Sequence, residues 1–202
     1  METPCVRFRS ALEFHKFDAE GFAFWLDIVE MNITLIGMAG VGKSFIGQEL
    51  ATVLHYGFID IDELIEKQFN QTLQEIVDRF GEQRFLKIEE QAILDLGEID
   101  HCVISPGGSA VYSVKAMEFL RKNSIVLFLD ASFESIKNRV HNESTRGIIG
   151  LKKRKLKDLY MERRPLYQKY SEITIGLPDG LEKDTVIKEI LKKLPRSGQK
   201  RK

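Results

Sequence analysis

A glycine-rich segment between two apolar runs constrains the fold of this chain more than any other feature. The segment GMAGVGKS (37–44) follows NITLI (32–36) and precedes FIGQELATVL (45–54). Glycines allow left-handed backbone angles and a close approach to an anion, so the N–H groups of such a loop point inward and the next helix adds its positive end. The pattern G-x-x-x-x-G-K-S between a strand and a helix therefore predicts a loop that holds the phosphates of a nucleoside triphosphate.

Two side chains at the end of this motif carry its chemistry. Lys43 can reach the β- and γ-phosphates, and the hydroxyl of Ser44 can bind Mg²⁺. The motif indicates a bound triphosphate, but it does not distinguish kinases from GTPases or motor proteins.

Short apolar runs alternate with helix-like segments from residue 31 to about residue 195. This alternation predicts an α/β fold with a buried parallel sheet. The expected strands cover 32–36, 57–60, 101–105, 124–129 and 172–175. The expected helices cover 43–54, 61–68, 72–95, 113–121, 132–140, 152–169 and 183–193.

The two ends of the chain differ from this central part. Residues 1–30 show no clear period, and Met31 directly precedes the first expected strand. We expect residues 1–30 to be an N-terminal extension or the result of a non-native start, attached to a domain of residues 31–195. The alternative is an N-terminal helix that packs on the domain. The basic tail, residues 196–202, is expected to be disordered.

Composition excludes several classes of partner. Thirty Lys and Arg residues balance thirty Asp and Glu residues, so no global charge favours nucleic acid or a membrane surface. No apolar run approaches the length of a membrane span, and the first thirty residues are too acidic for a transit peptide. With two cysteines that match no metal site, we expect a cytoplasmic protein without nucleic-acid or membrane partners.

A pair of acidic residues follows the second expected strand. In GFIDID (57–62), Asp60 and Asp62 would point the same way if both lay on the strand, since side chains alternate with a period of two. One acid could hold the Mg²⁺ and its water shell, while the other could bind an acceptor hydroxyl and take its proton. The alternative is a pair of solvated acids, with Asp62 as a helix cap.

Five segments together resemble the shikimate kinase family, over about residues 31–194. They are GMAGVGKS, FIDIDELIE, FGEQRFLKIEEQAI, SPGGSAV and ERRPLY. The resemblance implies a P-loop kinase in three layers, with a five-stranded parallel sheet flanked by helices and a mobile lid. It also implies a monomer or weak dimer in amino-acid biosynthesis that uses ATP and Mg²⁺ to phosphorylate the 3-hydroxyl of shikimate.

The resemblance also implies roles for particular residues. Catalysis would fall to Lys43, Asp62 and Arg146, the last being the lid arginine that closes over the phosphates. The ATP site would comprise Gly37, Gly40, Gly42, Lys43, Ser44, Phe45 and Arg139, and the metal site Ser44 and Asp60. The acceptor would be bound by Asp62, Gly107, Gly108 and Arg163.

The charge pattern agrees with a lid. Lys and Arg outnumber Asp and Glu between residues 137 and 169, which suits a flap that meets polyphosphate. For KKRKLK (152–157) we favour a solvated helix face. Arg163 and Arg164 are two candidates for one carboxylate; the family pattern selects Arg163, and Arg164 would then face solvent.

Two departures from the family pattern affect the acceptor end. The family has an arginine, a second partner of the shikimate carboxylate, where this chain has Leu86; losing one partner of a buried charge pair costs ~2–5 kcal/mol. Lys87 is a poor substitute, since one residue along a helix turns the side chain about 100° away. Ser109 stands where the family has a third glycine. Glu89 either braces the acceptor pocket or is an ordinary exposed acid.

These departures leave several hypotheses open. The chain could phosphorylate shikimate with a compensating change, or another small hydroxylated acid, amino alcohol or polyol. It could also bind nucleotide without transferring phosphate. The Gly-Gly and R-x-P-L-Y elements argue against a nucleoside-monophosphate or gluconate-type kinase.

Overall fold

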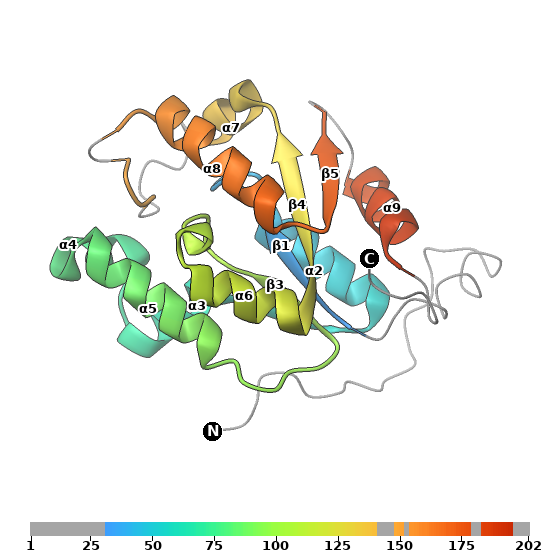
Figure 1. The fold of residues 1–202 in the computed structure, drawn as a ribbon, viewed down its shortest axis with the longest axis horizontal. Coiled ribbons are helices and arrows are strands. Elements are labelled where there is room, and N and C mark those ends of the chain that lie inside the picture. Colours follow the sequence, from blue (N-terminus) through green and yellow to red (C-terminus); the bar gives the residue numbers. More distant parts are fainter. Residues whose placement is uncertain (1–30, 141–147, 152–153, 179–182, 196–202) are drawn as a thin grey trace.

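A five-stranded parallel sheet forms the centre of the protein (Figure 1). The computed structural model describes residues 31–140, 148–151, 154–178 and 183–195. Within these residues the strand order is β2-β3-β1-β4-β5. The strands are β1 (Asn32–Ile36), β2 (Gly57–Asp60), β3 (Cys102–Ser105), β4 (Ser124–Ala131) and β5 (Ile173–Leu177). The predicted α/β class and five-stranded parallel sheet are confirmed.

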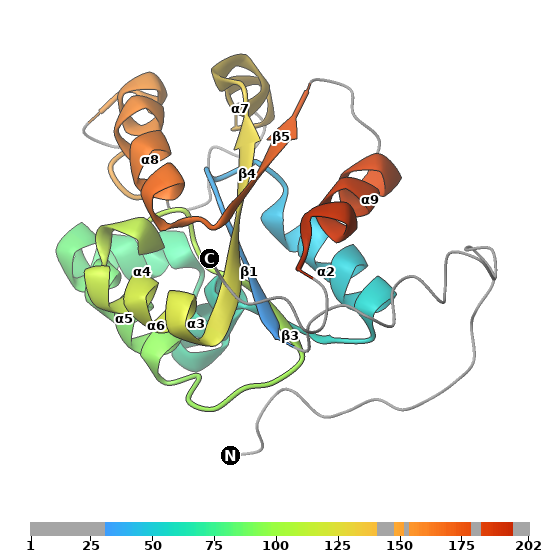
Figure 2. The same ribbon diagram turned by 45° about the vertical axis from the view of Figure 1, so that its right-hand side comes forward.

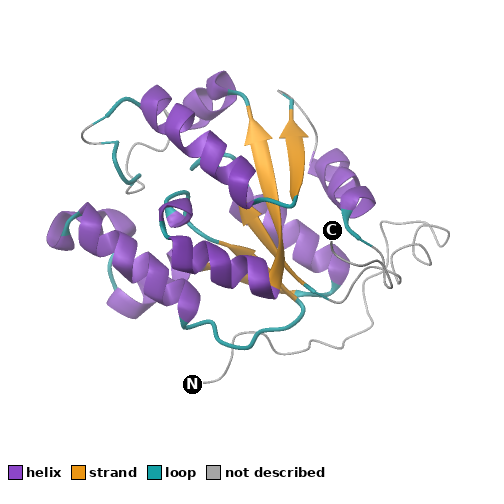
Figure 3. Ribbon diagram, viewed as in Figure 1, coloured by secondary structure: helices purple, strands orange, loops and turns teal. Residues whose placement is uncertain are grey.

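Helices cover both faces of the sheet (Figures 2 and 3). On one face lie α2 (Lys43–Leu54) and α9 (Lys183–Lys193); on the other lie α6 (Val114–Asn123) and α8 (Leu156–Tyr170). The remaining described helices are α3 (Ile61–Phe69), α4 (Leu73–Phe80), α5 (Glu82–Leu94), the 3-10 turn η1 (Ala110–Tyr112) and α7 (Phe133–Val140). In the described part of the chain, no helix is both long and apolar enough to cross a membrane.

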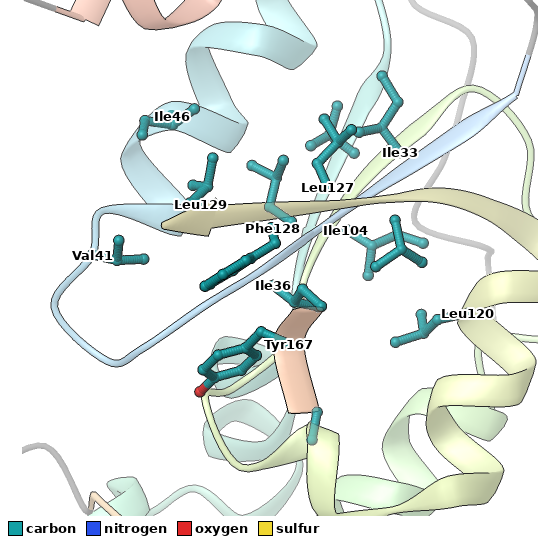
Figure 4. Close-up of a cluster of buried hydrophobic side chains, with 14 of the residues drawn as sticks. Ile33, Ile36, Val41, Ile46, Ile104, Leu120, Leu127, Phe128, Leu129 and Tyr167 are labelled. Atoms are coloured by element: carbon teal, nitrogen blue, oxygen red, sulfur yellow. The ribbon is translucent and has the colours of Figure 1, made fainter. Parts of the chain in front are cut away.

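The central strand β1 is buried along its whole length. Ile33 pairs with Val103 of β3 on one side and with Ile125 of β4 on the other. Phe128 and Tyr167 stack with ring centroids 5.3 Å apart and close this core toward α8 (Figure 4). Both faces of β1 are covered, so its apolar residues Ile33, Leu35 and Ile36 and its two polar residues, Asn32 and Thr34, are all buried.

The polar residues of this buried region have hydrogen-bond partners, as burial demands. The hydroxyl oxygens of Thr34 and Ser124 lie 2.6 Å apart between β1 and β4. The Asn32 amide donates to the carbonyl oxygens of Ile99 and Asn123, at 2.8 and 2.9 Å. These bonds hold the start of β1 in register with its neighbours.

The helix predicted over residues 72–95 is in fact two helices. Gly81 adopts φ 79° and ψ 160°, a conformation that cannot continue an α-helix, so α4 ends at Phe80 and α5 begins at Glu82. Thr72 and Glu75 form a capping box at the start of α4. The helix predicted over 152–169 is α8, which begins later, at Leu156.

The predictions for the N-terminal extension (1–30), the basic tail (196–202) and most of the lid lie outside the described residues. Within the described part, the chain leaves β1, β2 and β3 at the same edge of the sheet, because parallel strands share their carboxyl ends. Open α/β sheets bind ligands at this edge, and the predicted site residues other than the three arginines lie at or just after the ends of these three strands.

Candidate active site

The glycine-rich loop joins β1 to α2 and leaves the start of that helix open. Gly40 and Gly42 have φ values of 78° and 100°. Gly42 is the N-cap of α2, and no described side chain caps the helix there. The N–H groups of the first turn are therefore available to an anion.

Gly37 has a different task from the other glycines of the loop. A Cβ at this position would come within 2.8 Å of the carbonyl oxygen of Leu129. Gly37 therefore allows the end of β1 to pass close to β4, and it does not line the cavity described below.

Lys43 is the first residue of α2 and folds back over the loop. Its Nζ donates to the carbonyl oxygens of Gly37 (3.1 Å) and Met38 (3.3 Å). Burial lowers the pKa of Lys43, and the carboxylates of Asp62 and Asp60 oppose that shift. A buried ammonium group thus lies within the field of two carboxylates at the place where phosphates are expected.

Ser44 and Asp60 link the loop to the second strand. The hydroxyl of Ser44 donates to Oδ2 of Asp60 at 2.5 Å. Asp60 also caps α3, because its Oδ1 accepts the N–H groups of Asp62 (3.0 Å) and Glu63 (3.4 Å). These two hard oxygen donors suit a Mg²⁺ ion, which keeps most of its waters and takes one or two protein ligands.

The predicted end of the strand at Asp60 and start of the helix at residue 61 are confirmed. Because Asp62 therefore lies in the first turn of α3, the argument that strand alternation points Asp60 and Asp62 the same way does not apply. Asp60, and not Asp62, is the helix cap. Both acids nevertheless reach the same cavity, because the helix begins directly at the carboxyl edge of the sheet.

A cavity of about 680 Å³ brings most of the predicted site residues together. Among the predicted residues, its lining includes Gly40, Gly42, Lys43, Ser44, Phe45, Asp60, Asp62 and Gly108. Side chains of α3 and the start of α4 complete one wall, among them Glu66 and Leu73. Among the described residues no cluster of three or more His, Cys, Asp or Glu is placed to hold a metal, so a metal here would depend on Ser44, Asp60 and a bound triphosphate.

The turn after β3 needs its two glycines because it is confined on both sides. A Cβ at Gly107 would overlap Oε1 of Glu89 and come within 2.8 Å of Oδ1 of Asp62. A Cβ at Gly108 would come within 3.1 Å of the backbone nitrogen of Ala39. The turn therefore lies between the acidic side of the site and the P-loop, and Gly108 lines the cavity.

Arg163, on α8, is 1% exposed and lies behind this turn. Its Nη2 donates to the carbonyl oxygen of Ile149 (2.6 Å), and its Nε donates to the hydroxyl of Tyr112 (3.1 Å). Its Nη1 would be 3.5 Å from a Cβ at Gly108. The guanidinium group thus lies next to the glycine turn.

The sequence predicted that Arg164 would face solvent, but its guanidinium group is bound by a carboxylate. Its Nε and Nη2 donate to the two carboxylate oxygens of Asp130, at 3.0 and 2.7 Å. Asp130 lies near the carboxyl end of β4. Arg164 therefore fixes α8 to the sheet.

The remaining predicted residues flank the loop or fall outside the described range. Nη1 of Arg139 donates to the carbonyl oxygen of Val41 at 3.0 Å, which places this arginine against the P-loop. Phe45 is 55% exposed and lines the cavity. Arg146 lies outside the described residues.

The burial of Glu89 rules out the alternative that it is an ordinary exposed acid. Glu89 is 1% exposed, and its Oε2 accepts a hydrogen bond from the hydroxyl of Ser109 at 2.7 Å. Burial, and then the nearby charge of Asp62, raise the pKa of Glu89 to about 7. Leu86 packs against the hydrophobic core, and Lys87 is exposed, as its place on the helix predicted.

Three residues near the site were not identified from the sequence. Tyr167 donates its hydroxyl to the carbonyl oxygen of Gly108 at 2.7 Å, and Tyr112 contacts Arg163. Oε1 of Glu82 accepts the N–H of Gly150 at 3.0 Å. Tyr167 and Glu82 do fall inside segments that carried the resemblance; for Tyr112 the sequence offered no signal.

The fold and this cavity define a P-loop protein that binds a nucleoside triphosphate, with the loop after the central strand and two acids beside it. The sequence matches the family described as shikimate kinase over residues 39–195. The chain therefore belongs to the shikimate kinase family.

Individual relatives cover most of both chains. The shikimate kinase of Caldanaerobacter subterraneus subsp. tengcongensis is 33% identical over 150 residues, which are 73% of this chain and 87% of the relative. That of Thermodesulfovibrio yellowstonii is 34% identical over 167 residues, 82% of this chain and 95% of the relative.

Solved structures agree with the family assignment. Shikimate kinase from Acinetobacter baumannii in complex with shikimate superposes with a TM-score of 0.73 at 30% identity, over 80% of this chain and 92% of that one. Shikimate kinase from Aquifex aeolicus gives a TM-score of 0.69 at 32% identity, over 80% and 94%.

Proposed function

We propose that this protein transfers the γ-phosphoryl group of ATP to the 3-hydroxyl of shikimate. The observation that carries the proposal is a single cavity in which Lys43, Asp60 and Asp62 meet Gly108, with Arg163 buried behind the turn. The relatives, which are shikimate kinases, support the same reaction.

The nucleotide end of the cavity consists of the P-loop and the residues around it. The open N–H groups at the start of α2 bind phosphate oxygens, and Lys43 leaves its two carbonyl partners to pair with the phosphates. Arg139 and Phe45 flank the base, and Arg146 is the residue that the family pattern assigns to the phosphates. Ser44 and Asp60 would hold Mg²⁺, and ATP bound with Mg²⁺ would supply the phosphoryl group to be transferred.

The acceptor end consists of Asp62, the glycine turn and Arg163. Asp62 accepts a hydrogen bond from the acceptor hydroxyl, orients it and takes its proton. The backbone of Gly107 and Gly108 approaches the acceptor and the transferred group, while Arg163 pairs with the carboxylate. Since phosphoryl transfer depends mostly on positioning and charge neutralisation, these few groups are sufficient.

Family membership also supports proposals on the location of the protein, its oligomeric state and its domain bounds. We infer a cytoplasmic protein that acts as a monomer or weak dimer, without nucleic-acid partners. We further infer that residues 31–195 form the catalytic domain and that residues 1–30 and 196–202 are additions to it.

One observation favours a second candidate acceptor. Leu86 packs on the core, so the acceptor carboxylate loses one of its two cations. A different small hydroxylated acid, an amino alcohol or a polyol would depend less on that cation. The fold and nucleotide end would be unchanged.

A panel of acceptors tests both candidates. The protein is mixed with ATP, Mg²⁺ and one acceptor at a time, and ADP release is followed, with Lys43→Met as the matched inactive control. Shikimate-dependent ADP release by the wild type alone is the expected result. Release with another hydroxylated compound and none with shikimate would replace the proposed acceptor, and nucleotide binding with no turnover on any compound would remove the kinase activity.

A further inference from the structure

The proposed reaction assigns no role to the buried carboxyl group of Glu89. It lies on α5 and is 1% exposed. Oε2 accepts the hydroxyl of Ser109 at 2.7 Å, whereas Oε1 is buried without a hydrogen-bond partner among the described residues. Leaving a buried acceptor unsatisfied is costly. The hydrogen bond from Ser109 should therefore matter more for the position of this carboxyl group than an ordinary hydrogen bond would.

The position of Glu89 ties it to the acceptor end. A Cβ on Gly107 would overlap Oε1 of Glu89, and the same Cβ would come within 2.8 Å of Asp62. The carboxyl group therefore lies directly against the glycine turn, next to the acid proposed as the base. A movement of Glu89 would move Gly107 and, with it, Gly108 on the cavity wall.

Ser109 does not obstruct the cavity, although it replaces a glycine of the family pattern. Its φ of −92° is open to any L-residue, so no glycine is required there. Its side chain is buried, donates toward α5 and is not part of the cavity lining. The extra hydroxyl therefore acts on Glu89, behind the turn.

Leu86 explains why Glu89 needs this hydroxyl. Position 86 precedes Glu89 by three residues on α5, and side chains with this spacing are neighbours on a helix. An arginine at 86 would be within reach of the Glu89 carboxylate, but leucine has nothing to donate. Lys87 points to solvent, so in the described part of the chain Ser109 is the donor that Glu89 has.

We propose that Ser109 is a positioning residue that compensates for Leu86: its hydroxyl holds Glu89 against the glycine turn, where an arginine at position 86 would otherwise do so. The inference rests on the proposed function for its effect on the acceptor. It makes the two departures from the family pattern one coupled change.

A double-mutant cycle tests the coupling in the reaction. Ser109→Ala removes only the hydroxyl and should raise KM for shikimate roughly ten- to a hundredfold, the usual cost of a lost bond to a charged group. KM for ATP should stay within about twofold, since only acceptor binding is affected. In a Leu86→Arg background the same change should have less than about a threefold effect, because the arginine then holds Glu89.

Ser113→Ala is the matched control. Ser113 donates to Glu90, the next residue of α5, at 2.5 Å, and it caps α6 away from the cavity. It should lower thermal stability without changing KM for shikimate. Equal rises in both KM values for Ser109→Ala, or an undiminished effect in the Leu86→Arg background, would overturn the proposal.

A carboxyl titration of the unliganded protein gives a readout that needs no activity. The groups that face Glu89 are Asp62, Lys43 and Arg163, besides the Ser109 hydroxyl. The NMR signal of the Glu89 carboxyl, identified by its absence in Glu89→Gln, should titrate at higher pH in Ser109→Ala and return toward the wild-type position when Leu86→Arg is added.

The two measurements separate the two claims. A wild type that never phosphorylates shikimate would remove the proposed function, and the titration would still decide the role of Ser109. A Glu89 signal that does not respond to Ser109→Ala, or that responds equally to Ser113→Ala, would overturn the inference.

Discussion

The hydroxyl of Ser44 donates a 2.5 Å hydrogen bond to the carboxylate of Asp60 and thereby joins the P-loop to the end of β2. The other carboxylate oxygen of Asp60 caps α3. One side chain therefore serves both the proposed metal site and the helix that carries Asp62, and these two tasks can be separated by mutation.

Asp60→Asn should keep the cap and weaken the metal site. Asn caps helices as well as Asp does, but it lacks the charge that Mg²⁺ requires, so kcat should fall by about a hundredfold or more. Melting temperature should change little. Asp60→Ala should lose both functions and about 1 kcal/mol of additional stability. Full activity of Asp60→Asn at low Mg²⁺ would contradict this assignment.

Arg163→Gln should impair acceptor binding. Removing one partner of a buried charge pair costs ~2–5 kcal/mol, which is at least about a thirtyfold rise in KM for shikimate. Arg164→Gln is the control, because its pair with Asp130 is partly exposed and worth about 1 kcal/mol or less. Steady-state kinetics on both variants, with melting curves, make the comparison; similar rises for the two arginines would refute the assignment of Arg163.

Tyr167→Phe should loosen the glycine turn. The variant removes the hydroxyl that donates to the carbonyl oxygen of Gly108, at a cost of about 1–2 kcal/mol in the free energy of unfolding. KM for shikimate should rise several-fold. Tyr160→Phe, which removes a similar bond from the same helix to the carbonyl oxygen of Ala131, should cost comparable stability and leave KM unchanged. An equal rise in KM for shikimate in Tyr160→Phe would show that Tyr167 does not act through the glycine turn.

The buried carboxyl of Glu89 predicts a pH dependence of stability. Burial and Asp62 raise the pKa of Glu89 to about 7, against 4.5 for an ordinary glutamate. Between these values the folded protein holds a proton that the unfolded chain releases, so this group lowers stability as pH rises from about 4.5 to about 7, by ~3 kcal/mol in all. Above pH 7 its contribution is constant.

Glu89→Gln should remove this dependence. Urea denaturation at pH 5 and pH 8 should therefore show the variant gaining ~3 kcal/mol relative to the wild type at the higher pH. Glu98→Gln, at an exposed position, should show no such gain. A Glu89→Gln difference that is the same at both pH values would mean that Glu89 is already ionised in the folded protein.

The nucleotide end could be predicted from the sequence because its signals are local. The strand, the glycine loop and the helix follow one another without interruption, and the glycine at 42 with Lys43 and Ser44 fixes the chemistry within eight residues. The strands were predictable for a similar reason, since a sheet covered on both faces favours short, predominantly apolar runs.

The acceptor end depends on contacts between distant segments, and here the sequence was less informative. The helix break at Gly81 was missed because a glycine within a helical pattern is often tolerated. The boundary between β2 and α3 was predicted correctly, but strand alternation was still applied to Asp62, which the helix carries. The direction of the Ser109 side chain follows from Glu89, twenty residues away in the chain, and no local pattern reveals it.

The most direct test follows the phosphoryl group itself. The protein is incubated with Mg²⁺, shikimate and ATP radiolabelled at the γ-phosphate, and the products are separated. We predict that the label appears in phosphorylated shikimate in proportion to the ADP formed, and that Asp62→Asn abolishes it. Label found only in inorganic phosphate, or remaining in ATP while shikimate is unchanged, would contradict the account.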